Sequence, residues 1–160
     1  MSLRLATLEE VPLICKEFQK FEKKQKTDGK PPVFAFIRQD YLKRCVSDGS
    51  LYFDNGIIAV MKQYKVRTKY GNKKGEWGLL ELLNTNLTDN FAILKFMYKV
   101  LHDKVKDSKL YATIRDDNTQ SIKFHTAFGY KRTKDIVWSN GTLPGGIYVY
   151  DNLKRKNNGK

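Results

Sequence analysis

Apolar and polar positions in the first third of the chain predict a short strand followed by two helices. Leu3 to Ala6 is expected to form the strand, and Thr7 with Glu9 and Glu10 behind it is typical of a helix start. The apolar residues that follow recur at helical spacing: Val11, Leu13, Ile14, Phe18 and Phe21. The polar stretch 23–32 predicts an exposed loop, and a second helix is expected near residues 39–47.

From Ser50 onward the pattern changes to strands joined by short turns. Two apolar runs, 51–53 and 57–61, flank an Asn-Gly pair, which is a strong signal for a tight hairpin. We expect residues 64–70 to continue the second strand, residues 71–75 to turn, and a third strand to run from Trp77 to Leu83. Connections this short imply antiparallel pairing.

In the second half, helices alternate with strands. An amphipathic helix is expected to open at Thr88-Asp89 and to reach about Ser108, followed by a strand over 110–114 that runs parallel to the preceding one. Asn118 should start a short helix that stops at Gly129. With closing strands near 132–138 and 146–150, the pattern predicts an α+β fold around a mixed, mostly antiparallel sheet.

Composition places this pattern in one globular domain with an unusual charge. The 160 residues carry 30 Lys+Arg against 17 Asp+Glu, a formal net charge of +13, and are 41% hydrophobic. These proportions exclude collagen-like, low-complexity and disulfide-scaffold proteins. We expect a single domain over residues 1–153 and a basic tail over 154–160.

Two cysteines, Cys15 and Cys45, lie in predicted helices and suit a reducing compartment. We expect a cytoplasmic protein, because no apolar run is long enough for a membrane span and the N-terminus lacks the layout of a signal peptide. Two histidines and two separated cysteines give no metal-ligand spacing, so no metal is expected.

The positive charge is concentrated in one stretch that contains no acidic residue. It comprises Lys62, Lys65, Arg67, Lys69, Lys73 and Lys74. Tyr64 and Tyr70 stand between these charges, an arrangement in which rings stack on bases while cations follow phosphates. The stretch is equally consistent with a solvated hairpin face. Lys131, Arg132 and Lys134 form a second basic cluster.

Residues 110–130 carry the most specific motif of the chain. An apolar strand leads to Asn118, then to a small residue, an aromatic pair, and Gly129 followed by Tyr130. This segment resembles the closing motif of the GCN5-related N-acetyltransferase (GNAT) superfamily, and residues 3–10 resemble its usual start. The resemblance implies a sheet of six to seven strands flanked by about four helices, with splayed central strands forming a V-shaped cleft for acyl-coenzyme A.

The resemblance also implies the chemistry. Acetyl-CoA or another acyl-CoA would be the donor and an amine the acceptor. The residues implied along the donor are Leu82, Leu83, Asn84, Asp89, Asn90, Asn118 and Phe124. Glu81 is the candidate base for the ammonium proton, and His125 stands where the family commonly has the tyrosine that serves the thiolate.

Each candidate also has a structural interpretation. Asn118 is equally typical of a helix cap, Glu81 of a strand residue that faces solvent, and His125 of an exposed or partly packed helix residue. Tyr130 is more typical of the core than of catalysis.

One segment departs from the family pattern, and it leaves two functions open. Residues 84–92 contain neither glycine nor arginine, where the family has a glycine-rich pyrophosphate loop. The first function is an N-acyltransferase whose acceptor is a nucleic acid or a nucleic-acid-associated protein. The second is a non-catalytic GNAT-like nucleic-acid-binding or adaptor protein without acyl-CoA. A small basic chain with a drifted motif also fits a phage or other mobile element.

Overall fold

The computed structural model describes residues 3–30, 34, 37–86, 90–138 and 142–153. They fall into two compact units that alternate along the chain: residues 1–61 with 81–99, and residues 62–80 with 100–160. Within the described residues, six strands lie in the order β1 (Leu51–Asp54), β2 (Ile57–Gln63), β3 (Trp77–Asn84), β4 (Lys109–Arg115), β6 (Leu143–Asp151) and β5 (Lys131–Trp138). The β1–β2, β4–β6 and β5–β6 pairs are antiparallel, and the β3–β4 pair is parallel. This confirms the predicted mixed, mostly antiparallel sheet. The single domain over 1–153 stays a prediction, and the tail lies outside the described residues.

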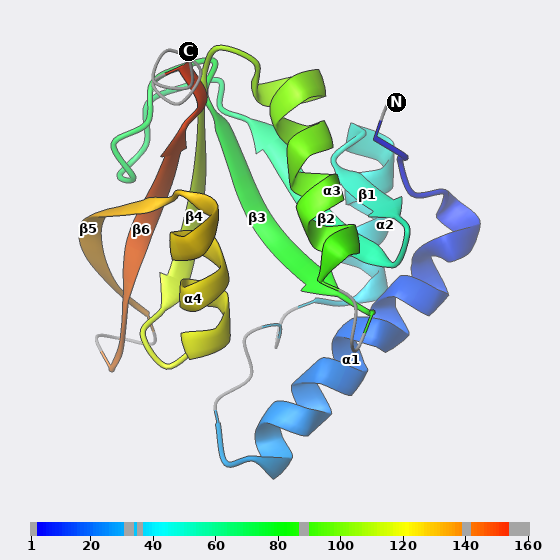
Figure 1. The fold of residues 1–160 in the computed structure, drawn as a ribbon. Coiled ribbons are helices and arrows are strands. Elements are labelled where there is room, and N and C mark those ends of the chain that lie inside the picture. The colour runs from blue at the N-terminus through cyan, green and yellow to red at the C-terminus, as the bar shows by residue number, and fades with distance from the viewer. Residues whose placement is uncertain (1–2, 31–33, 35–36, 87–89, 139–141, 154–160) are drawn as a thin grey trace. The chain divides into compact units, whose positions relative to one another are not determined.

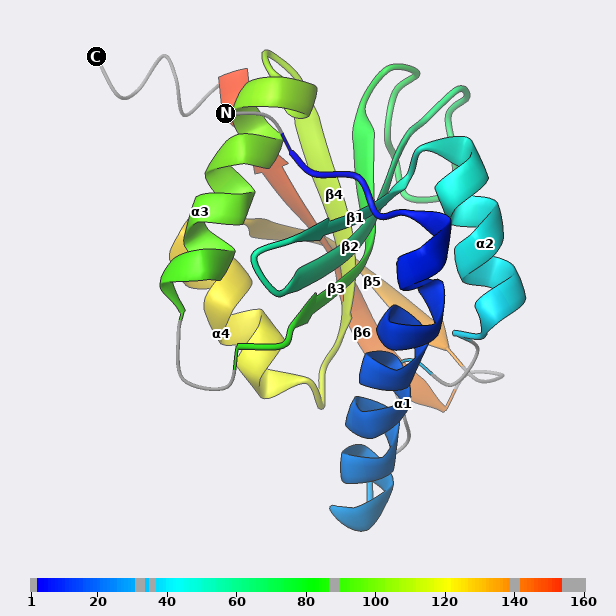
Figure 2. The same cartoon turned by 90° about the vertical axis from the view of Figure 1, so that its right-hand side faces the viewer.

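The first unit is built on a hairpin covered on both faces. Its elements are a 3₁₀ turn (Leu8–Glu10), α1 (Val11–Thr27), α2 (Gln39–Asp48), β1 (Leu51–Asp54), β2 (Ile57–Gln63) and α3 (Phe91–Val100). Residues 62–63 of β2 and the last residue of α3 belong to the second unit. Figure 2 shows α1 and α2 on one side of the β1–β2 hairpin and α3 on the other. Ile14 and Phe18 of α1, Leu42 of α2 and Ile58 of β2 are fully buried in one apolar cluster, which stabilises the unit.

The hairpin and the start of the chain show which local signals were decisive. Asn55 and Gly56 both have positive φ, 49° and 80°, as a tight hairpin turn requires. Residues 3–6, in contrast, do not form the expected strand and make only an isolated bridge between Leu5 and Tyr52. Thr7 is the N-cap as predicted, and the Glu10 carboxylate accepts a hydrogen bond from its backbone N–H at 2.9 Å.

The second unit contains β4 (Lys109–Arg115), α4 (Thr119–Phe128), β5 (Lys131–Trp138) and β6 (Leu143–Asp151). β6 pairs antiparallel with both β4 and β5, and Figure 1 shows α4 running beside β4. Aromatic rings join the helix to the sheet, since the Phe128 ring lies 5.2 Å from that of Tyr150. The left-handed stop at Gly129 has φ 124° and ends α4 where the sequence predicts.

Three predictions for helix ends and connecting segments were wrong. β2 ends at Gln63, and residues 64–75 form an irregular loop, which we call the basic loop, rather than a strand and a turn. The α-helix α3 ends at Val100, and a π-helix (Leu101–Val105) follows it. The predicted opening of this helix at Thr88-Asp89 lies outside the described residues, and α1 reaches Thr27, well into the stretch expected to be a loop.

Candidate functional site

β3 (Trp77–Asn84) is the strand on which the candidate residues depend. Among the described residues, its parallel ladder with β4 joins only Trp77 with Leu110 and Gly78 with Tyr111. Both strands continue beyond this point, β3 by six residues and β4 by four. From Leu79 onward, the β4-facing backbone groups of β3 are therefore not used by that ladder.

Glu81 lies in the first unit, on β3, and is half-buried rather than solvent-facing. Burial raises the pKa of its carboxyl from the ordinary 4.5 to about 7. Tyr41 of α2 is a neighbour of Glu81 that the sequence analysis did not identify. Burial is the largest cause that raises the pKa of the Tyr41 hydroxyl, and the charge of Glu81 is the next. The hydroxyl also hydrogen-bonds with Cys45. A carboxylate that titrates near neutrality is suited to take a proton from an ammonium group.

The other candidates in the first unit differ in their exposure. Leu83 is buried in the apolar cluster, whereas Leu82 and Asn84 are half-buried. The Asn84 side chain accepts a hydrogen bond from the Asn86 N–H at 2.9 Å, which turns the chain after β3. Asn90 is exposed just before α3, and its carbonyl accepts the hydrogen bond of Leu94. Asp89 lies outside the described residues.

The start of α3 is suited to bind an anion. Its first turn carries no acidic side chain, and the first amide groups of any α-helix have no partner within the helix. These amides and the positive end of the helix dipole favour a negatively charged group.

Asn118 lies in the second unit and caps α4, as one of the two interpretations predicts. Its Oδ1 accepts a hydrogen bond from the Ser121 N–H at 3.4 Å. Capping uses the oxygen of the side-chain amide and leaves the Nδ2 group as a donor. The structural and the binding roles of Asn118 are therefore compatible.

His125 is a buried residue of α4, 4% exposed, so the expectation of an exposed or partly packed position is wrong. Its Nδ1–H donates to the Ser121 carbonyl at 2.8 Å; because a carbonyl only accepts, we assign the proton to Nδ1 and the lone pair to Nε2. Burial lowers the pKa of the imidazole, although the Ser121 bond opposes this effect. His125 is therefore neutral at pH 7, and its Nε2 lone pair is suited to accept a hydrogen bond rather than a proton.

Aromatic neighbours fix the His125 ring. It packs edge-on against Tyr130 at 4.7 Å and against Phe124 at 5.3 Å. Phe124 is half-buried, and Tyr130 is a core residue, as expected, with a buried hydroxyl that has no hydrogen-bond partner among the described residues.

The predicted basic stretch is in the second unit, and its fold depends on two residues that the sequence did not reveal. Asn72 is fully buried at the centre of the basic loop; its Oδ1 accepts from the backbone N–H and hydroxyl of Thr68, and its Nδ2 donates to the Val66 carbonyl at 3.0 Å. Glu76 is also buried, and its Oε1 accepts from the Lys73 N–H at 2.6 Å.

These contacts leave the basic side chains of the loop facing solvent. Lys65, Arg67, Lys69, Lys73 and Lys74 are exposed, and Lys62, at the end of β2, is half-buried. Tyr64 does not project between the charges, because its half-buried ring packs edge-on against Tyr111 at 6.1 Å. The expectation that Tyr64 is available to stack on a base is therefore not supported.

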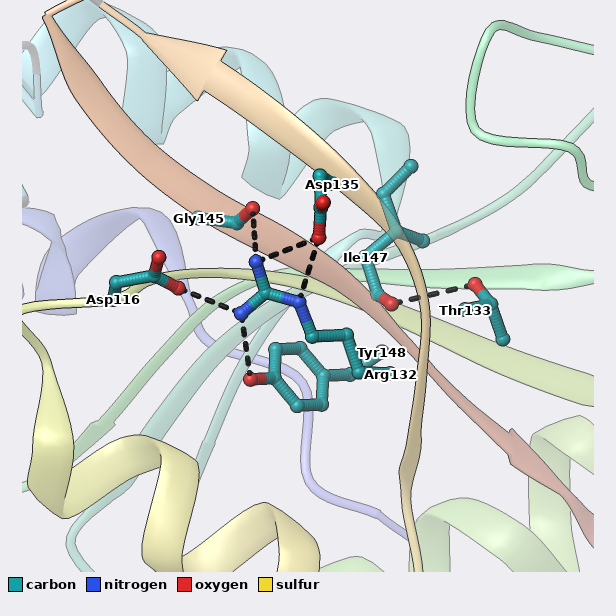
Figure 3. Close-up of polar contacts among 7 residues, drawn as sticks. All are labelled: Asp116, Arg132, Thr133, Asp135, Gly145, Ile147 and Tyr148. Atoms are coloured by element: carbon teal, nitrogen blue, oxygen red, sulfur yellow. Dashed lines mark hydrogen bonds and ion pairs between the residues drawn. The ribbon is translucent and has the colours of Figure 1, made fainter.

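The second basic cluster carries less net positive charge than its sequence suggests, because two carboxylates balance the charge of Arg132. Figure 3 shows its guanidinium held by Asp116 at 2.7 Å, by Asp135 at 2.9 Å and by the Gly145 carbonyl at 2.9 Å. The hydrogen bond to Asp116 is the largest cause that raises the pKa of Arg132. Lys134 remains exposed and donates to the carbonyl of Lys69 in the basic loop at 3.3 Å.

Comparison with known proteins bears on the fold. No protein-family model matches the chain, and no curated protein does. Among solved structures, an acetyltransferase of the GNAT family from Streptococcus agalactiae 2603 has a TM-score of 0.76 at 11% identity, covering 94% of each chain. The chain has the GNAT fold.

Two further structures with the GNAT fold cover nearly all of the chain. A GNAT-family acetyltransferase from Bacillus cereus ATCC 10987 has a TM-score of 0.65 at 11% identity and covers 94% of this chain and 96% of its own. Aminoglycoside acetyltransferase AAC(6')-Ib, in complex with coenzyme A and kanamycin, has a TM-score of 0.68 at 13% identity, over 99% of both chains. These likenesses confirm the predicted GNAT fold.

The described part of the GNAT-fold chain shows neither a metal cluster nor a membrane-spanning helix. In the part of the chain that the structure describes, no three His, Cys, Asp or Glu side chains gather closely enough to hold a metal ion. None of the described helices combines the length and the apolar character needed to cross a membrane.

Proposed function

We propose that this protein is an N-acyltransferase that moves an acyl group, acetyl in the first instance, from acyl-CoA to an amine. The observation that carries the proposal is Glu81, a half-buried carboxyl with a pKa of about 7 on β3 of a GNAT-fold chain. Coenzyme A in the GNAT-fold structure of AAC(6')-Ib supports the choice of donor.

The described residues fit such a donor in three ways. Backbone groups of β3 beyond Gly78 are not engaged by β4, so they suit the amides of a pantetheine arm beside Leu82, Leu83 and Asn84. The first turn of α3, after Asn90, suits a pyrophosphate even without the glycine loop. On α4 of the second unit, Asn118 has an Nδ2 donor and Phe124 a half-buried ring, and these are the groups that the resemblance implies for the donor.

The proposed roles keep the protons balanced. Glu81, ionised at or above neutral pH, takes one proton from the ammonium group, and the free amine attacks the thioester carbonyl. A carbon–nitrogen bond forms, and the carbon–sulfur bond breaks with its electron pair on sulfur. The thiolate takes its proton from solvent, because the neutral imidazole of His125 keeps its one proton on Nδ1, in the hydrogen bond to the Ser121 carbonyl.

The acceptor is the finer part of the proposal. The exposed cations of the basic loop favour an amine that is carried on a polyanion, either a nucleic acid or a protein bound to one. Their removal should weaken capture of the acceptor and leave the affinity for the donor unchanged.

Calorimetric titration with acetyl-CoA and with CoA, at low and at moderate salt, tests the donor. Saturable binding that survives salt supports the acyltransferase. Asn118→Ala removes both the cap and the Nδ2 donor, whereas Asn118→Ser keeps a capping oxygen, so equally weakened binding in both variants assigns the loss to Nδ2. Binding that vanishes with salt would refute the acyltransferase in favour of a donorless nucleic-acid-binding or adaptor protein.

Release of free thiol during turnover with a panel of amines tests the chemistry. The rate should rise with pH around a midpoint of about 7 and should lose that dependence in Glu81→Gln. A rate that is the same in Glu81→Gln and the unmodified protein at every pH would remove Glu81 from the mechanism.

A further inference from the structure

A cavity of about 580 Å³ lies wholly within the second unit, at the base of the basic loop. Gln63 and Gly75, at the two ends of the loop, line it together with Trp77, the first residue of β3, and residues 103–108. None of the residues assigned above to the donor or to catalysis lines this cavity. A volume of this size lies in the range of small-molecule sites.

The backbone along one wall of the cavity is unusual. The π-helix Leu101–Val105 ends at Lys106, which has φ 54° and ψ −121° although it is not a glycine. Asn152 holds this conformation by donating from Nδ2 to the carbonyls of Leu101 and Lys106. π-helical turns and non-glycine residues with positive φ occur frequently at functional sites, which supports a role for this wall.

The charge around the cavity is positive because of the loop. Lys104 and Lys106 are balanced by Asp103 and Asp107 within the lining. The exposed loop cations have no such balance, because Glu76, the one acidic residue among residues 62–80, is buried and accepts from the Tyr111 hydroxyl at 2.9 Å. A ligand that enters the cavity is therefore expected to carry its negative charge outside it, along the loop.

The lining is suited to a flat ring that carries polar groups. Trp77, which is half-buried, supplies an aromatic ring to the lining. The Gln63 Nε2 already donates to the Gly75 carbonyl at 3.0 Å, and its Oε1 can accept. The Ser108 hydroxyl can donate and accept, and the carboxylates of Asp103 and Asp107 can accept from exocyclic amino groups. A nucleobase has such a ring, and its phosphates would lie outside the cavity. In a duplex the bases are stacked and paired, so only an unpaired strand supplies a free base.

We propose that this cavity binds one unpaired base of a single-stranded nucleic acid, with Trp77 stacking on the base and Lys65, Lys73 and Lys74 contacting the neighbouring phosphates. The proposal adds a partner to the proposed function without depending on it, because binding needs no acyl donor. An acidic protein would use the lysines and leave Trp77 untouched, so the role of Trp77 distinguishes the two partners.

Intrinsic fluorescence tests the base site directly. The chain has two tryptophans, Trp77 and Trp138, so Trp138→Phe leaves Trp77 as the single reporter. Titration of this variant with a 12-nucleotide single strand, without any CoA compound, should quench its emission saturably. The matching duplex and polyglutamate should bind more weakly or leave the emission unchanged. Single-strand binding with no change in emission would overturn the proposal.

Affinity measurements complete the test. By fluorescence anisotropy of the labelled strand, Trp77→Leu should bind about 5- to 150-fold more weakly, and Trp77→Phe should recover part of this loss. Lys65, Lys73 and Lys74 all changed to Gln should lower the slope of log affinity against log salt by about 2.

The matched control changes Lys16, Lys23 and Lys24, which are exposed on α1 of the other unit, to Gln. Its net charge falls equally, but its salt slope should be preserved. Equal losses in the two triple variants, or an unchanged affinity of Trp77→Leu, would mean that charge alone attracts the strand and would refute the site. Loss of strand binding with acetyl-CoA binding intact would leave the proposed function standing.

Discussion

The raised pKa of Glu81 makes the stability of this protein dependent on pH. Burial raises it from 4.5 to about 7, so the folded protein binds more protons at this site than the unfolded chain between those pH values. The free energy of unfolding therefore falls as pH rises through this window. The difference in pKa corresponds to about 3 kcal/mol, which is fully lost above pH 7.

Glu81→Gln removes this charge while it keeps the size of the side chain. We expect the variant and the unmodified protein to be similarly stable near pH 4.5, where the carboxyl is neutral in both states. At pH 8 the variant should be more stable by about 3 kcal/mol, a rise of about 6–12 °C in the melting temperature.

Urea unfolding at pH 4.5, 6, 7 and 8 measures the difference between the two proteins at each pH. Glu9→Gln, at an exposed position before α1, is the control for the removal of one carboxylate, and it should change stability by less than about 0.5 kcal/mol throughout. A difference between Glu81→Gln and the unmodified protein that stays constant from pH 4.5 to 8 would show that Glu81 is not held in a desolvating environment. The proposed base would then lose its physical support.

Three further changes test individual contacts by thermal unfolding. Asn72→Ala removes the buried side chain at the centre of the basic loop and should lower the free energy of unfolding by about 2 kcal/mol. Amide hydrogen exchange should become faster in the loop alone, and unaltered exchange there would contradict this role of Asn72. Lys99→Met removes the ammonium group that lies 2.9 Å from the buried carboxylate of Asp54, and it should lower the free energy of unfolding by about 3 kcal/mol. If the ion pair is the cause, adding Asp54→Asn should restore part of this stability. Gly56→Ala should lower the free energy of unfolding more than Gly49→Ala does. Both positions have positive φ, but of these two only Gly56 would place a Cβ 2.7 Å from the side chain of Asn86. Equal losses would show that the Asn86 side chain moves aside.

Signals that lie within a few residues of sequence predicted the fold well. Asn55-Gly56 located the hairpin, Asn118 and Gly129 bounded α4, and the apolar strands after residue 76 were found close to their observed limits. Each of these features depends on the conformational preference or the hydrogen bonding of one or two residues. The same local logic made the resemblance of residues 110–130 to the GNAT motif informative about the fold.

Features that depend on contacts between distant residues were not predictable. Residues 64–70 alternate polar and apolar side chains as a strand does, but Asn72 supplies hydrogen bonds that compete with a β ladder. The pKa of Glu81 is raised by its burial, and His125 is neutral because an aromatic cluster covers it; neither effect follows from spacing. Tyr41 and the Trp77 cavity were missed because no motif marks them.

The alternation of the two units along the chain has a genetic consequence. The polypeptide passes from one unit to the other after residues 61, 80 and 99, so each unit is made of two separate stretches. No single cut or truncation therefore yields either unit on its own. A gene fragment that encodes the whole first unit must span residues 1–99 and so also encodes the basic loop, which means that the proposed catalytic carboxyl cannot be separated from the loop by truncation.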